Sequence, residues 1–230
     1  MTPQTIRWHG FADMADLQAD ALLRIRTAAS NAIGARGLFR VVLAGGSTPR
    51  AIYQMLRKAI TDWSKWQVYF GDERCLPIAD PQRNSRMARD TLLDQVPIPR
   101  ANIHTIPAES GPVEGAAQYA QTLRAVGEFD LVLLGLGEDG HTASLFPDHD
   151  WGEAHDAADA LGVFDAPKPP PERVSLSAAR LGRARCVLFL VDGEAKREAI
   201  ARWRAGDRIP ASAIAPASGV DVLTESSLLA

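Results

Sequence analysis

The segment that follows the apolar run at 131–136 carries the side chains best suited to acid–base chemistry. Asp139, Gly140 and His141 come directly after this run. Histidine is the side chain whose ordinary pKa lies closest to neutrality, and a carboxylate two residues before it can orient the ring. The pattern indicates a general base, His141, held by Asp139. A purely structural histidine is the alternative interpretation.

A glycine-rich turn follows a second apolar run, at 39–44. The turn consists of Gly45, Gly46, Ser47 and Thr48. Thr48 before Pro49 is typical of a helix start, and the free N–H groups at a helix N-terminus favour an anion such as phosphate. The turn lacks the lysine of a Walker A loop, so a tight strand-to-helix turn without a ligand is equally consistent with the sequence. The formal GxGxxG match at 135–140 follows a late strand and is not interpreted as a dinucleotide site.

Charged side chains also lie next to three other strand-like runs. They are Asp72 and Arg74 after one run, Arg173 before another and Lys196 after a third. Open parallel sheets bind ligands at the carboxyl ends of their strands, which favours a common site for these groups and His141. The cations could bind a phosphate, whereas isolated charges more often face solvent.

Apolar runs and helical patterns alternate along nearly the whole chain. Strands are predicted at 5–8, 39–44, 68–70, 102–106, 131–136, 174–176, 186–191 and 220–223. Helices are predicted at 11–33, 51–60, 84–93, 113–125 and 194–204. This alternation predicts an α/β fold, a mostly parallel sheet with helices on both faces, formed by residues 1–230 as a single domain. The acidic and then proline-rich segment 148–171 is predicted to be a long loop or crossover segment.

Composition excludes several classes of function. The chain has 230 residues, 46% of them hydrophobic, and a formal net charge of −3, so it can bury a large core but has no basic surface for nucleic acid. Its two cysteines make no disulfide framework and favour the cytosol. The N-terminus lacks an apolar signal region, and no apolar stretch reaches the roughly 20 residues of a membrane span. His149 and His155 match no common metal-site spacing, so no metal is predicted.

Six blocks carry a resemblance to a known family. They are GGSTP (45–49), GDER (71–74), NSRM (84–87), GLGEDGHTASLFP (135–147), PKPPPERVSLS (167–177) and DGEAK (192–196). The chain resembles the 6-phosphogluconolactonases of the glucosamine-6-phosphate isomerase/6-phosphogluconolactonase family, whose modified Rossmann-like fold is thereby expected. The resemblance implies hydrolysis of 6-phospho-glucono-1,5-lactone, the second step of the oxidative pentose phosphate pathway, without metal or cofactor.

The same resemblance implies how the substrate is bound. The phosphate would be met by Arg173, Lys196 and the Ser47 and Thr48 amides, and Asp72 would lie near the sugar hydroxyls. Arg74 or amides of the glycine loops, Gly45, Gly46 and Gly140 among them, would stabilise the oxyanion. The partner implied is a small sugar-phosphate lactone, bound by a monomer or small homo-oligomer.

Two alternatives remain at the level of sequence. Glucosamine-6-phosphate deaminases of this family carry a glutamate five residues after the motif histidine, where this chain has Phe146. A phenyl ring transfers no proton, which favours the lactonase. A non-catalytic sugar-phosphate sensor would keep the phosphate loop and the cations but would not need Asp139 and His141.

Overall fold

The computed structural model describes residues 4–230, and its centre is a six-stranded sheet in which every pairing is parallel. Its strands are, in spatial order, β1 (Ile6–Phe11), β9 (Val220–Glu225), β8 (Val187–Leu190), β5 (Leu131–Leu134), β2 (Phe39–Leu43) and β3 (Trp66–Phe70). Every residue of β5 and β8 is buried. Their unbroken apolar sequences therefore fit strands that are covered on both faces.

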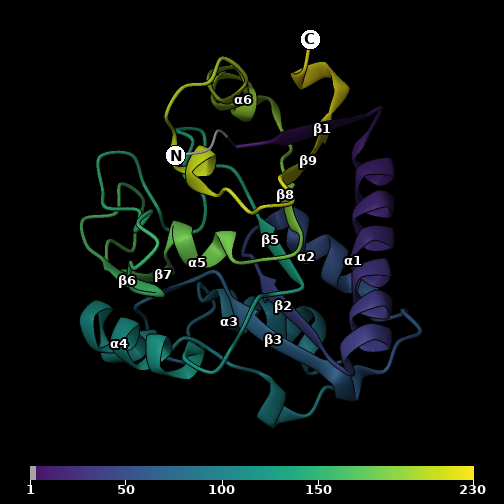
Figure 1. The fold of residues 1–230 in the computed structure, drawn as a ribbon, viewed down its shortest axis with the longest axis vertical. Helices are drawn as coiled ribbons and strands as arrows, with labels where there is room; N and C mark the ends of the chain where they lie inside the picture. Colours follow the sequence, from purple (N-terminus) through teal and green to yellow (C-terminus); the bar gives the residue numbers. More distant parts are fainter. Residues whose placement is uncertain (1–3) are drawn as a thin grey trace.

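Helices cover this sheet on two sides (Figure 1). The helices among residues 4–230 are α1 (Met14–Arg36), α2 (Ser47–Leu56), α3 (Asn84–Ala88), α4 (Pro112–Leu123), α5 (Ala178–Gly182) and α6 (Arg197–Arg204). Of these, α3 and α4 pack mainly on the second sheet described below. The long helix α1 begins at Asp13, whose side chain accepts a hydrogen bond from the amide of Asp16, and ends at Gly37 with φ 75°. Its inward stripe runs from Leu17 to Ala32 at helical spacing. The predicted α/β fold with a mostly parallel sheet is confirmed.

A second, three-stranded sheet differs from the prediction. It contains β4 (Asp72–Arg74), β7 (Arg173–Leu176) and β6 (Ala160–Val163), and both of its pairings are antiparallel. Strand β6 lies within the segment predicted to be a long loop. Its four residues include a glycine, and the strand exists because it pairs with β7, a partner that no local pattern reveals. Strand β4 places Arg74 directly opposite Arg173.

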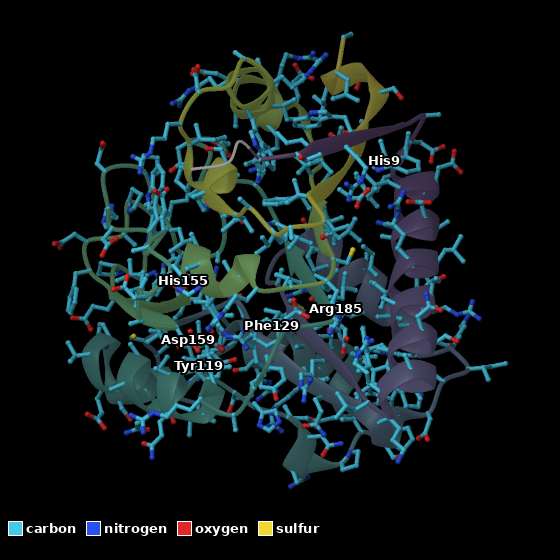
Figure 2. The ribbon with its side chains drawn as sticks, viewed as in Figure 1. His9, Tyr119, Phe129, His155, Asp159 and Arg185 are labelled. Atoms are coloured by element: carbon cyan, nitrogen blue, oxygen red, sulfur yellow. The ribbon has the colours of Figure 1, made fainter. Side chains whose placement is uncertain are left out.

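The second sheet is joined to the rest of the protein by α5 and by charged contacts. Asp159, just before β6, accepts a hydrogen bond from Arg183 and lies 3.5 Å from Nε of Arg180, on α5 (Figure 2). The Arg180 guanidinium is buried and lies 3.8 Å from the centre of the Phe129 ring. The prediction that the chain forms a single domain stays a prediction.

Three smaller differences concern element boundaries. The prediction of a strand at 102–106 is wrong. This segment follows a 3₁₀ turn, Arg100–Asn102, and forms only an isolated bridge between Ile103 and Val68. The helix predicted at 84–93 is α3 followed by a wider π-helical turn, Arg89–Leu93. The helix predicted at 194–204 begins with a 3₁₀ turn, Glu194–Lys196. Among residues 4–230, no helix is both long and apolar enough to cross a membrane.

Candidate active site

A cavity of about 190 Å³ opens where β2, β3 and β5 end. Six of the residues singled out in the sequence line it: Gly45, Gly46, Asp72, Arg74, His141 and Arg173. These residues come from four separate segments. Three of them follow β2, β3 and β5, whose ends share one edge of the parallel sheet. Arg173 joins them because β7 pairs with β4, which places it opposite Arg74. The expected convergence of His141 with the glycine turn, Asp72, Arg74 and Arg173 is therefore present in the structure, whereas Lys196 does not line this cavity.

His141 faces this cavity with its ring fixed by a carboxylate. Its Nδ1 is hydrogen-bonded to Oδ1 of Asp139, which also accepts the His141 amide at 3.2 Å. The Gly137 amide donates to the His141 carbonyl at 2.7 Å and closes the turn. Within the described part of the chain, Nε2 of His141 has no hydrogen-bond partner. An Asp139 carboxylate on Nδ1 places the proton there, so that Nε2 is free to accept one.

Burial sets the protonation state of this pair. Desolvation lowers the pKa of His141 below its ordinary value, although the Asp139 carboxylate acts in the opposite direction. Burial alone would raise the pKa of Asp139, but the interaction with His141 outweighs it and lowers that pKa. At neutral pH the pair is therefore a neutral imidazole held by a carboxylate, which is the state that a general base requires.

Gly137 makes room for this arrangement. A Cβ at this position would lie 1.9 Å from Nδ1 of His141 and 2.6 Å from Oδ1 of Asp139. No side chain fits there while the imidazole and carboxylate keep their contact. Glycine is thus required by the close approach of the His141 and Asp139 side chains, a reason that the sequence alone did not reveal.

Asp72 is held by two side chains that sequence reasoning did not assign to the site. Its Oδ1 accepts from Nδ2 of Asn84 at 2.9 Å, and its Oδ2 accepts from Oγ of Ser144 at 2.5 Å. A Cβ on Gly45 would lie 2.0 Å from the Asn84 side-chain oxygen, so Asn84 also packs closely on the glycine turn. Ser144 lies inside the block 135–147 and Asn84 at the start of a predicted helix, but nothing local marks either as a partner of Asp72.

The glycine turn leads into α2 as expected, but its side chains have different surroundings. Ser47 lines an adjacent cavity together with Arg50 and Arg74. The Thr48 side chain is buried, and its hydroxyl donates to the carboxylate of Asp192, which ties this turn to the loop after β8. The first amides of a helix have no acceptor within the helix, so the backbone of Ser47 and Thr48 remains available to an anion.

Arg173 serves partly to hold a neighbouring loop. Its Nε donates to the Pro170 carbonyl at 3.1 Å and its Nη2 donates to the Lys168 carbonyl at 2.7 Å. The guanidinium also lies 5.4 Å from the centre of the Phe146 ring. Burial lowers the pKa of Arg173, but a guanidinium stays charged at neutral pH. Arg173 therefore contributes positive charge to the cavity wall while it fixes the course of residues 168–170.

Five predicted site residues do not line the cavity. Three of them, Ser47, Thr48 and Asp139, are described above, and the other two are Lys196 and Gly140. Lys196 lies in the 3₁₀ turn that precedes α6, three residues after Gly193. Gly140 has φ 87° and packs on Ile209, which a Cβ would approach to 2.9 Å. Their roles in substrate binding remain predictions. Among residues 4–230, no three His, Cys, Asp or Glu side chains are grouped so that they could hold a metal ion.

Comparisons with known proteins find relatives that match most of the chain. Residues 12–223 match the family model described as glucosamine-6-phosphate isomerases/6-phosphogluconolactonase. A 6-phosphogluconolactonase of Streptomyces coelicolor is 39% identical over 224 residues, which span 89% of this chain and 84% of that protein. One of Synechocystis sp. is 39% identical over 192 residues, 78% of this chain and 77% of that protein.

Solved structures show the same fold. The crystal structure of 6-phosphogluconolactonase from Thermotoga maritima superimposes with a TM-score of 0.89 at 26% sequence identity, covering 96% of this chain and 100% of that one. The family match and the two relatives each span most of the chain, so the resemblance read from the sequence is confirmed. The chain belongs to the glucosamine-6-phosphate isomerase/6-phosphogluconolactonase family.

Proposed function

We propose that this protein is a 6-phosphogluconolactonase, which hydrolyses 6-phospho-D-glucono-1,5-lactone to 6-phospho-D-gluconate. The observation that carries the proposal is the His141–Asp139 pair, with a neutral imidazole facing the cavity at the strand ends. The names of the similar relatives support the same activity. A lactone is an internal ester, so its opening needs an activated water and a donor for the oxyanion.

His141 acts as the base in the proposed reaction. Its Nε2 takes a proton from a water molecule, whose oxygen attacks the carbonyl carbon C1 of the lactone. The C1–O bond to the ring oxygen then breaks, and the ring oxygen takes the proton back from the imidazolium. The products are a carboxylic acid, which ionises, and a free hydroxyl. Asp139 stabilises the imidazolium that forms between the two transfers.

The cavity supplies groups for the other charges that develop. In the proposed reaction, Arg74 and the amides of the glycine turns that line the cavity donate to the tetrahedral oxyanion, where preorganised donors contribute most. Asp72, held by Asn84 and Ser144, accepts from a sugar hydroxyl. The phosphate is assigned to the Ser47 and Thr48 amides with Arg173 and Lys196.

The surroundings of Phe146 favour a lactonase over a deaminase. Phe146 is fully buried, and the centre of its ring lies 4.7 Å from that of His141. At this position a deaminase of the family needs a proton-carrying carboxylate, and the phenyl ring offers none. A sensor would have no use for a partly buried imidazole oriented by a carboxylate, which disfavours that alternative too.

Two rate measurements test the proposal. The purified protein should open 6-phospho-D-glucono-1,5-lactone far faster than the spontaneous reaction, followed by acid release in weakly buffered solution. Glucosamine-6-phosphate should release no ammonia under the same conditions. A protein that leaves the lactone to open at its spontaneous rate would contradict the proposal, and ammonia release would favour the deaminase. A cytosolic location, a monomer or small homo-oligomer, and catalysis without metal or cofactor are further parts of the proposal.

A further inference from the structure

Glu73 is a fully buried acid between two residues that line the cavity, Asp72 and Arg74. Its Oε1 accepts hydrogen bonds from the amides of Arg74 at 2.9 Å and Asn84 at 2.7 Å. Its Oε2 accepts from the amide of Ser85 at 2.8 Å. One carboxylate thus fixes the backbone of β4 to the start of α3, two segments that contribute side chains to the cavity.

Arg83 provides the opposite charge for this carboxylate. Its side chain is 2% exposed, and its Nε lies 3.4 Å from Oε2 of Glu73. The same guanidinium donates to the Leu76 carbonyl at 3.0 Å, to Oε2 of Glu109 at 2.7 Å and to the Ile106 carbonyl at 2.8 Å. The pair is therefore enclosed and held from several sides, which is the condition under which a buried ion pair is tolerated.

The pair reaches the substrate cavity through Asn84. By holding the backbone amide of Asn84, Glu73 also holds the Asn84 side chain. The Nδ2 group of this side chain donates a hydrogen bond of 2.9 Å to Oδ1 of Asp72, and the side chain packs on Gly45. The amide of Arg74 is fixed by the same oxygen. Because the proposed function assigns Asp72 to the sugar hydroxyls and Arg74 to the oxyanion, both groups depend on one carboxylate outside the cavity.

We propose that Glu73, paired with Arg83, is a positioning residue that sets the substrate-binding geometry of Asp72, Asn84 and Arg74. This inference rests on the proposed function for its kinetic consequences. The role requires a carboxylate rather than an amide. All the groups that face its two oxygens are N–H donors, so a glutamine in either orientation would turn its own NH₂ group toward a donor and lose an acceptor.

The test is the variant Glu73→Gln, which keeps the size of the side chain. Its KM for the lactone should rise about tenfold, roughly the loss expected when a hydrogen bond to the substrate is misplaced. The acid limb of its pH–rate profile should move little, because the His141–Asp139 contact is untouched and Asp139 affects the pKa of His141 more than Asp72 does. An unchanged KM, or a shifted acid limb with unchanged KM, would overturn the proposal.

A matched control separates positioning from stability. Asp130 is also a buried carboxylate, which accepts from an arginine side chain, Arg36, and from a backbone amide, that of Arg40 at 2.8 Å. It lies just before β5, whereas the cavity lies at the other end of this strand, around Leu134 and Gly135. Asp130→Asn should lower the melting temperature and leave KM within about twofold of the wild-type value. A tenfold rise in its KM would show that loss of stability alone explains the Glu73 variant.

A second variant and a second readout keep the proposal open to refutation. If Glu73→Gln does not fold, Arg83→Lys retains the charge but loses the fork that reaches Leu76, Ile106 and Glu109, and it should also raise KM. An unchanged KM in that variant would overturn the proposal.

If the wild-type protein opens no lactone, the proposed function fails, yet the side-chain amide resonances of Asn84 still report its position. They should shift in Glu73→Gln or Arg83→Lys and not in Asp130→Asn, and unshifted resonances would refute positioning.

Discussion

Gly137→Ala should remove most of the activity without disturbing the fold. The added Cβ would lie 1.9 Å from Nδ1 and 2.1 Å from Cε1 of His141, and 2.6 Å from Oδ1 of Asp139. No real Cβ tolerates such contacts, so the imidazole must leave its place and its bond to Asp139. A misplaced general base costs about 10² to 10⁴ in rate, and we expect kcat to fall by that factor.

The backbone at Gly137 does not itself demand glycine. Its φ lies outside the left-handed region, which the structure shows at Gly140 but not here, so alanine is accepted by the main chain. The loss should therefore arise from the displaced His141, with a small change in melting temperature. The control is Gly127→Ala, at an exposed site where a Cβ would meet no atom within 4 Å. Rates of lactone opening, corrected for the spontaneous reaction, decide the matter, and a wild-type kcat in Gly137→Ala would refute the reasoning.

Two further predictions concern charge. The neutral imidazole is the active base and burial lowers its pKa, so kcat should fall only as the pH drops through a value below the ordinary histidine pKa. Asp139 raises that pKa and Lys168 lowers it, so the acid limb of the pH–rate profile should move to lower pH in Asp139→Asn and to higher pH in Lys168→Ala. Shifts of the same sign in both variants would contradict this account. Lys196→Ala should raise KM for the phosphorylated lactone while kcat changes little, and an undiminished preference over the unphosphorylated lactone, measured in parallel, would exclude Lys196 from phosphate binding.

The sequence identified the parts of the site that depend on local pattern. The buried strand that ends before Asp139 and His141 is continuous and apolar, and the glycine turn before α2 carries a recognisable helix start. Parallel strand ends meet at one edge whatever their order, so the convergence of these groups could be inferred without knowing the strand order.

Features that depend on distant partners were not predictable in the same way. Strand β6 has no alternating pattern and forms because β7 lies beside it. Glu73 reads as one of several charged residues after a strand, yet it is fully buried because Arg83 and three backbone amides surround it. Thr48 reads as a helix N-cap, but α2 begins at Ser47 after Gly46, and the Thr48 hydroxyl is taken by Asp192, 144 positions further along the chain.

The central claim is that His141 activates the attacking water in a cavity that binds the sugar phosphate independently of it. The most direct measurement is the kcat of His141→Ala together with its affinity for the product, 6-phospho-D-gluconate. This account predicts that kcat falls by about 10² to 10⁴ while the dissociation constant of the product stays within a few fold of the wild-type value. A wild-type kcat in that variant would contradict the claim.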